Sequence, residues 1–151
     1  MNAPVTEMLG ETTLMIRRVY DADRPTLFQA LTSAEGITGW FGPGTFKVTN
    51  CESDVRVGGA WFIEMLNADG DTHNVGGEYV SVDAPNSVTF TWAWKWEPDE
   101  VSQVTYALTD AGDGKTTLTL THEKLPSQNS RDLHGQGWNG ALDNLGPWLA
   151  P

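Results

Sequence analysis

The side chains with catalytic potential are few and widely spaced. Histidines occur only at His73, His122 and His134, and Cys51 is the single cysteine. The chain has no His-x-x-x-His pair, no cysteine pair and no close set of carboxylates, so the ligand spacing of a metal site is missing. It also lacks a Ser-His-Asp order and a phosphate-cradling glycine motif. The sequence therefore predicts neither a metal nor another cofactor.

His122 is the strongest candidate for chemistry. It shares its strand face with Leu118 and Leu120, so it should point toward the core or a cavity, near the start of the last helix. A hydrogen-bonded core histidine is the favoured interpretation, and a ligand-binding or acid–base group is the alternative. His134 lies four residues before Trp138, where it could join the same cavity wall or sit at the solvent boundary.

The other reactive groups favour structural interpretations. His73 follows Asp69 and Asp71, which indicates a solvated hairpin turn. Glu64 alternates with apolar neighbours, and the strand period places it on the solvent side. Cys51 has no second cysteine or obvious base nearby in sequence, so a buried structural thiol is expected rather than a nucleophile.

An aromatic strand is the feature that most suggests a binding site. Because strand side chains alternate between the two faces of a sheet, Val88, Phe90, Trp92, Trp94 and Trp96 should form one apolar ridge. Each large aromatic side chain removes roughly 150–250 Å² from water when it is buried, so the ridge needs a broad apolar partner. That partner is either the core alone or the core together with a ligand.

The remaining elements follow from periodicity. Residues 1–10 are expected to form a loose arm, residues 12–20 a strand, and Asp23 and Ser33 should begin two short helices. Six strands in a meander should run from residue 45 to residue 123. A long helix should follow over residues 127–149, capped by Ser127 or Ser130 and ended or kinked by Pro147. Its apolar face should comprise Leu133, Trp138, Ala141, Leu142, Leu145 and Leu149.

Composition limits the class of partner. Twenty acidic residues against nine basic ones give a formal charge of −11, which opposes binding to nucleic acid or to an anionic membrane. The chain has no apolar run of about 18 residues and no signal-peptide pattern at its start, so a cytoplasmic protein without membrane insertion is expected. Its 151 residues are expected to form one domain.

These elements predict an α+β fold in which a curved antiparallel sheet of about seven strands grips the C-terminal helix. At this level the chain resembles the START-like, or SRPBCC, superfamily, and within it the group homologous to the C-terminal domain of the activator of heat-shock protein 90 ATPase. The resemblance is carried, in order, by Arg18–Ala22, Ile37–Phe41, Asp54–Gly59, Gly77–Tyr79, Val88–Trp92, Thr117–His122 and Gly137–Trp138, followed by Leu142 and Leu145.

The resemblance implies a helix-grip fold with an apolar cavity between the sheet and the long helix. Superfamily members bind lipids, sterols, polyketides and plant phenolics, and some catalyse cyclisation or hydration. We therefore expect the protein to bind a small apolar or aromatic ligand. The alternatives are that it is a cyclase or hydratase using His122, or that it activates a chaperone partner. It is expected to be a monomer or a homodimer. The expected ligand-binding residues are Trp40, Trp61, Phe90, Trp92, Trp94, Tyr106, Leu120, His122, Trp138 and Leu142.

Overall fold

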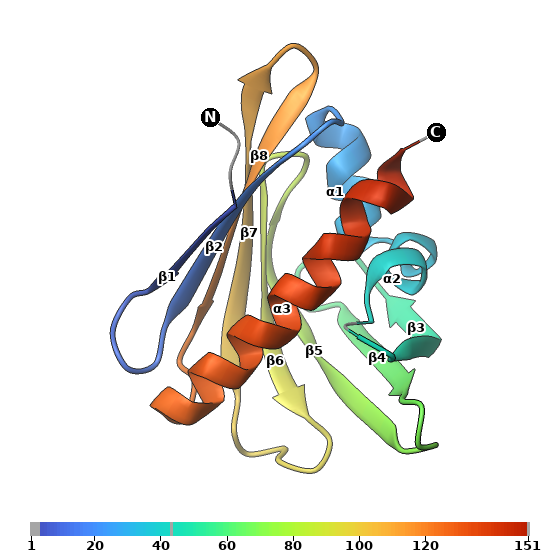
Figure 1. Ribbon diagram of the computed structural model, residues 1–151, viewed down its shortest axis with the longest axis vertical. Coiled ribbons are helices and arrows are strands. Elements are labelled where there is room, and N and C mark those ends of the chain that lie inside the picture. The colour runs from blue at the N-terminus through green and yellow to red at the C-terminus, as the bar shows by residue number, and fades with distance from the viewer. Residues whose placement is uncertain (1–3, 43, 151) are drawn as a thin grey trace.

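The long C-terminal helix α3 lies diagonally across one face of a curved antiparallel sheet (Figure 1). The structure is a computed structural model that describes residues 4–42 and 44–150. Its elements, in chain order, are β1 (Val5–Met8), β2 (Leu14–Tyr20), α1 (Arg24–Thr32), α2 (Ala34–Trp40), β3 (Lys47–Ser53), β4 (Ala60–Leu66), β5 (Thr72–Asp83), β6 (Ser87–Trp94), β7 (Ser102–Gly112), β8 (Lys115–Glu123) and α3 (Gln128–Leu149).

The sheet has eight strands in the order β1-β2-β8-β7-β6-β5-β4-β3, so the predicted six-strand meander and helix-grip fold are confirmed. The additional strand, β1, lies in the segment predicted to be a loose arm. Residues Val5–Met8 pair with Leu14–Arg17 of β2, so the loose-arm prediction is wrong for those four residues. Residues 1–3 of that arm lie outside the described part of the chain.

Local signals begin both short helices where the sequence predicts. The Asp23 carboxylate accepts a hydrogen bond from Thr26 N at 2.9 Å, and the Ser33 hydroxyl accepts one from Gly36 N at 3.0 Å. Each cap satisfies a backbone donor that the first helical turn leaves free. Trp40 closes the corner between the helices, because its indole Nε1 donates to the Ala30 carbonyl at 2.7 Å.

The aromatic ridge continues beyond its strand. Phe90 and Trp92 are buried on β6 and Trp94 is half-buried, but the strand ends at Trp94 rather than continuing through Trp96. A turn ends it, because Glu97 N donates to the Trp94 carbonyl at 3.0 Å. Trp96 is 52% exposed, yet its ring stacks on Trp94 with centroids 4.5 Å apart.

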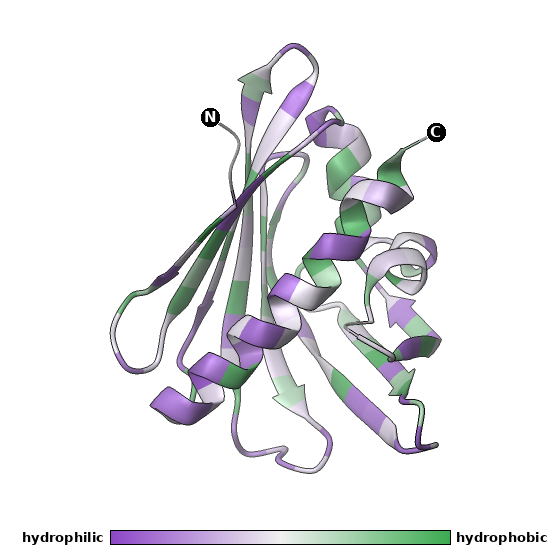
Figure 2. Ribbon diagram, viewed as in Figure 1, coloured by the Kyte–Doolittle hydropathy of each residue, from purple (hydrophilic) through white to green (hydrophobic). Residues whose placement is uncertain are grey.

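Helix α3 has two dissimilar halves. Ser127 is its N-cap, accepting from Ser130 N at 3.0 Å. Of the predicted apolar face, Trp138, Ala141, Leu142 and Leu145 are buried and Leu149 is half-buried, but Leu133 in the first half is 57% exposed. Hydrophilic residues are concentrated in that first half, whereas hydrophobic and hydrophilic residues alternate along the strands behind the helix (Figure 2). Pro147 lies in the last turn, and the helix continues past it to Leu149 before it ends.

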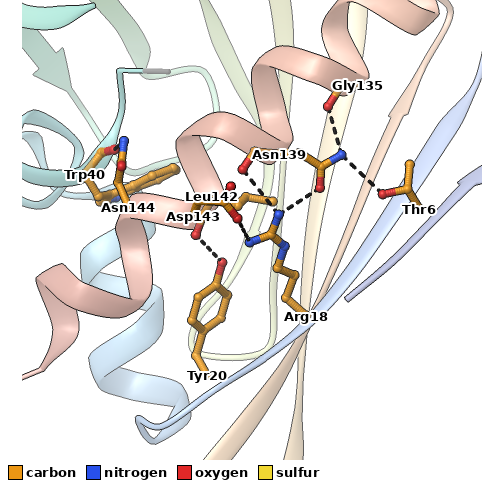
Figure 3. Close-up of polar contacts among 9 residues, drawn as sticks. All are labelled: Thr6, Arg18, Tyr20, Trp40, Gly135, Asn139, Leu142, Asp143 and Asn144. Carbon is orange, nitrogen blue, oxygen red and sulfur yellow. Dashed lines mark hydrogen bonds and ion pairs between the residues drawn. The ribbon is translucent and has the colours of Figure 1, made fainter. Parts of the chain in front are cut away.

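Polar contacts fasten the second half of α3 to β2 (Figure 3). The Arg18 guanidinium pairs with the Asp143 carboxylate at 2.6 Å and donates to Asn139 Oδ1 at 2.8 Å, and the Tyr20 hydroxyl donates to the Leu142 carbonyl at 2.9 Å. Burial raises the pKa of Tyr20 to about 12. Arg18 and Tyr20 therefore lie on the side of β2 that faces the helix. The sequence alone does not decide which side of this strand faces inward, because arginines occur on both.

The same half of α3 also contacts α2. The Asn144 amide donates to the carbonyls of Trp40, at 3.3 Å, and Gly42, at 3.1 Å. The Trp148 indole lies so close to Gly39 that a Cβ atom added there would overlap Trp148 Nε1. The C-terminal half of α3 is therefore held between β2 and α2, and the N-terminal half extends beyond these contacts.

Candidate functional site: an aromatic cavity under the first half of α3

A cavity of about 740 Å³ lies between the N-terminal half of α3 and the nearby end of the sheet. Its walls come from β4, β5 and β6, from the β6–β7 and β8–α3 connections, and from the segment between α2 and β3. The lining residues are Phe41, Phe46, Met65, His73, Trp92, Trp94, Trp96, Glu97, Glu100, Ser102, Leu125, Pro126, Ser127, Asn129, Ser130, Leu133, His134, Gly137 and Trp138.

Aromatic rings form the deep wall of the cavity. Trp92 and Trp138 face each other from β6 and α3 with ring centroids 5.1 Å apart. Phe41, at the end of α2, contacts both, at 6.3 Å from Trp92 and 5.8 Å from Trp138. Rings at these separations pack favourably in tilted and edge-to-face geometries. The wall is therefore built by three segments that are far apart in sequence.

A second aromatic group lies nearer the cavity mouth. The His73 ring packs edge-on against Phe46 at 4.9 Å and against Trp96 at 5.2 Å, with the stacked Trp94 ring 6.5 Å away. The prediction of a solvated turn for His73 is wrong, because β5 begins at Thr72 and pairs His73 with Met65 of β4. This pairing brings the His73 imidazole among the aromatic rings.

His122 lies behind the deep wall and is fully buried. Trp138 Nε1 can only donate, so its 3.0 Å bond to His122 Nδ1 makes that nitrogen the acceptor. His122 Nε2 therefore carries the proton and donates to Ser102 Oγ at 2.7 Å, and the Ser102 hydroxyl donates to the Trp92 carbonyl at 3.3 Å. Burial, and secondarily the proximity of His134, holds the pKa of His122 well below its usual value.

His134 is part of the cavity wall, one of the two positions that its spacing from Trp138 allows. Its Nε2 accepts from Trp94 Nε1 at 3.0 Å, and its Nδ1 donates to the Ser130 carbonyl at 2.7 Å. Burial lowers the pKa of His134, while the Ser130 carbonyl and the Glu97 charge oppose this shift. The imidazole therefore serves as a neutral hydrogen-bonding bridge between α3 and β6.

Polar groups in the lining are sparse. Trp92 Nε1 is buried and finds no hydrogen-bond partner among the described residues. Ser102 is buried, whereas Asn129 and the Glu97 and Glu100 carboxylates lie at the exposed rim. An unpaired buried donor of this kind costs free energy. The lining thus combines a large apolar surface with a few groups able to orient a ligand.

Three of the ten residues expected to bind a ligand line the cavity, namely Trp92, Trp94 and Trp138. The other seven lie in the packed core around the middle of the sheet and do not line it: Trp40, Trp61, Phe90, Tyr106, Leu120, His122 and Leu142. In that region α3 packs directly on the strands, so side chains from both sides fill the space. The cavity lies instead beneath the first half of α3, between Ser127 and Trp138.

The other reactive groups lie outside the cavity. Glu64 is half-buried on the face of β4 opposite the buried Ile63 and Met65, as its strand period predicts, and accepts from the Thr49 hydroxyl at 2.8 Å. Cys51 is half-buried on β3, and desolvation, with the Glu52 charge, raises the pKa of its thiol to about 11. Among residues 4–42 and 44–150, no three histidine, cysteine, aspartate or glutamate side chains are grouped to hold a metal ion.

Fold and cavity together define an α+β protein of the helix-grip type with an open, aromatic-lined cavity. The chain belongs to the Activator of Hsp90 ATPase homolog 1-like family, whose model matches residues 21–150. This match confirms the family resemblance and agrees with membership of the START-like superfamily. None of the helices in the described part of the chain is long and apolar enough to cross a membrane.

Solved structures from several bacteria share the fold over nearly their whole length. A protein from Chromobacterium violaceum is 25% identical, with a TM-score of 0.84 over 93% of this chain and 99% of its own. The AHSA1 protein from Silicibacter pomeroyi is 27% identical, with a TM-score of 0.82 over 91% and 96%. CalU16 from Micromonospora echinospora is 26% identical, with a TM-score of 0.71 over 100% and 86%. A comparison with curated proteins returns no match.

Proposed function

We propose that the protein binds a small apolar or aromatic molecule in the cavity beneath the first half of α3. The observation that carries this proposal is the cavity itself, whose volume of about 740 Å³ lies within the range of small-molecule sites. Its aromatic walls provide the apolar surface, and Ser127, Asn129 and Ser130 in its lining provide polar groups. A ligand enclosed there would need a flat apolar body.

The environment of His122 favours binding over catalysis. Both of its ring nitrogens are engaged inside the protein, by Trp138 Nε1 and Ser102 Oγ, and its side chain does not line the cavity. A general acid or base must reach the proton that it transfers, directly or through one water. The proposal therefore gives His122 a structural role. The family's name, which refers to a chaperone ATPase, specifies no partner for this chain.

Gly137 offers a direct test, because it lines the cavity and a Cβ atom built on it meets nothing within 4 Å. In Gly137→Leu the new side chain would occupy cavity space, whereas Gly137→Ala would occupy little of it. Both substitutions favour the helix, so they differ mainly in the filled volume. We expect both variants to fold.

The measurements are tryptophan fluorescence and the melting temperature, recorded with a panel of neutral, flat aromatic compounds. Wild type and Gly137→Ala should show saturable quenching and a rise in Tm, because a ligand that binds only the folded state stabilises it. Gly137→Leu should lose at least about tenfold in affinity, as expected when a ligand-sized space is filled. Equal affinity in Gly137→Leu, or no response from wild type to any compound, would contradict the proposal.

A further inference from the structure

The charged residues around the cavity are all of one sign. Among the lining residues, only Glu97 and Glu100 carry a formal charge, and neither arginine nor lysine lines the cavity. The N-terminus of α3 also lies at the cavity, at Ser127, where the helix dipole contributes roughly half a positive charge. Two full carboxylates outweigh that partial charge, so the potential at the mouth favours a cation.

Glu97 is fixed beside an aromatic surface that can itself hold a cation. Its Oε1 accepts a hydrogen bond from Trp96 Nε1 at 3.0 Å. The Trp96 ring stacks on Trp94 with an interplanar angle of 19° and is 52% exposed. Tryptophan faces are the strongest aromatic partners of ammonium groups. The carboxylate and the indole pair therefore present two cation-attracting features at the same rim.

We infer that the cavity selects organic cations, namely ligands with a flat apolar body and a protonated or quaternary amine held at the rim by Glu97, Glu100 and the Trp94–Trp96 stack. This inference rests on the proposed function and names the ligand class for the same cavity. The apolar body lies against the wall formed by Trp92, Trp138 and Phe41, while the amine stays at the mouth, where it remains partly hydrated. A carboxylate or phosphate at that position would face two negative charges.

His134 in the wall does not reverse this selectivity at neutral pH. Burial lowers the pKa of His134, and the imidazole is already committed to Trp94 and the Ser130 carbonyl. The chain's formal charge of −11 adds a long-range attraction for cations, which raises their local concentration without choosing a site. A test must therefore separate the two rim carboxylates from the overall charge.

Three probes with one ring system provide the comparison: 1-pyrenemethylammonium, neutral 1-pyrenemethanol and 1-pyrenecarboxylate. Their affinities for the full chain are measured by fluorescence titration at pH 7.5 and low ionic strength. The ammonium compound should bind at least about tenfold more tightly than the carboxylate, from combined ion-pair and cation–π attraction, with the alcohol between them. Equal affinities, or tighter binding of the carboxylate, would overturn the inference.

The variant Glu97→Gln/Glu100→Gln removes both rim charges, while the amide oxygen introduced at position 97 can still accept the Trp96 hydrogen bond. It should reduce the preference for the ammonium compound to about threefold or less, since the exposed ion pairs are lost. The control Glu78→Gln/Glu52→Gln removes two exposed charges outside the cavity lining and should leave the preference intact. An equal loss in both variants would assign the selectivity to overall charge and overturn the role of the rim.

The two proposals fail in different ways. If none of the three pyrene probes binds, and Gly137→Leu behaves like wild type with neutral compounds, the cavity is not a ligand site and the proposed function fails. If 1-pyrenemethanol binds and Gly137→Leu abolishes its binding, the cavity site stands. In that case a missing preference between ammonium and carboxylate overturns only the selection of cations.

Discussion

Trp138 Nε1 donates a hydrogen bond to His122 Nδ1 across 3.0 Å, which joins the middle of α3 to strand β8. The bond orders a chain of buried donors and acceptors that continues through Ser102 to the Trp92 carbonyl. Each member depends on the next for its partner, so the tautomer of His122 is set by the fold. These hydrogen bonds also hold Trp92 and Trp138, whose rings pack against each other in the cavity wall.

Replacing Ser102 with alanine should therefore destabilise the protein by about 1–3 kcal/mol, because the buried His122 Nε2–H loses its acceptor. Urea unfolding measures this difference from the shift in midpoint at unchanged slope. Ser81→Ala, at an exposed site on β5, is the matched control and should change stability by less than about 0.5 kcal/mol. Equal effects in the two variants would contradict the buried chain.

Stability should fall as the pH is lowered from about 6.5 toward 5. His122 and His134 have lowered pKa values in the folded protein, chiefly because of burial, so in this window the unfolded chain binds more protons than the folded one. The free energy of unfolding then rises with pH, by at most about 1.4 kcal/mol per pH unit for each histidine. Between pH 7 and 8, where histidine is mostly neutral in both states, these groups should contribute little slope.

The variant His134→Gln isolates one histidine, because the glutamine amide can still accept from Trp94 Nε1. It should reduce the slope between pH 6.5 and 5 by up to about 1.4 kcal/mol per pH unit, measured by urea unfolding at a series of pH values. Wild-type stability that stays constant from pH 7 to pH 5 would show that the two histidines are as easily protonated in the folded state as in the unfolded one.

The sequence predicts the fold well, because period and caps mark the regular elements. The alternation in residues 88–94, the caps at Asp23, Ser33 and Ser127, and the helical spacing from Trp138 to Leu145 all reappear in the structure. The strand β1 is missed because four residues with no strong period gain their order only by pairing with β2. Pairing of that kind is a tertiary effect that local sequence does not encode.

The cavity is predicted less completely. Ridge residues such as Trp92 and Trp94 are found because their period aligns them, but period cannot say where along the ridge packing stops and empty space begins. Phe46 and Leu125 line the cavity from connections outside the observed strands and helices. Their apolar character in loop positions is the one sequence signal that could identify them, since connecting segments are usually polar and exposed.

Two glycines on helices should respond oppositely to alanine. Gly137 has open space where a Cβ atom would lie, so Gly137→Ala should stabilise the protein by roughly 0.5–1 kcal/mol through helix propensity. At Gly39 the same atom would overlap Trp148 Nε1, so the indole must be displaced from α2. Overpacking of this kind costs about 1–3 kcal/mol, which exceeds the gain in propensity.

Urea unfolding of both variants should thus separate them by at least about 1 kcal/mol, with Gly39→Ala the less stable. Trp148→Ala provides the control, because it removes the obstacle: in that background Gly39→Ala should become neutral or stabilising, and the difference measures the coupling between the two residues. If Gly39→Ala raised stability as much as Gly137→Ala in the presence of Trp148, the close contact between α2 and the end of α3 would be wrong.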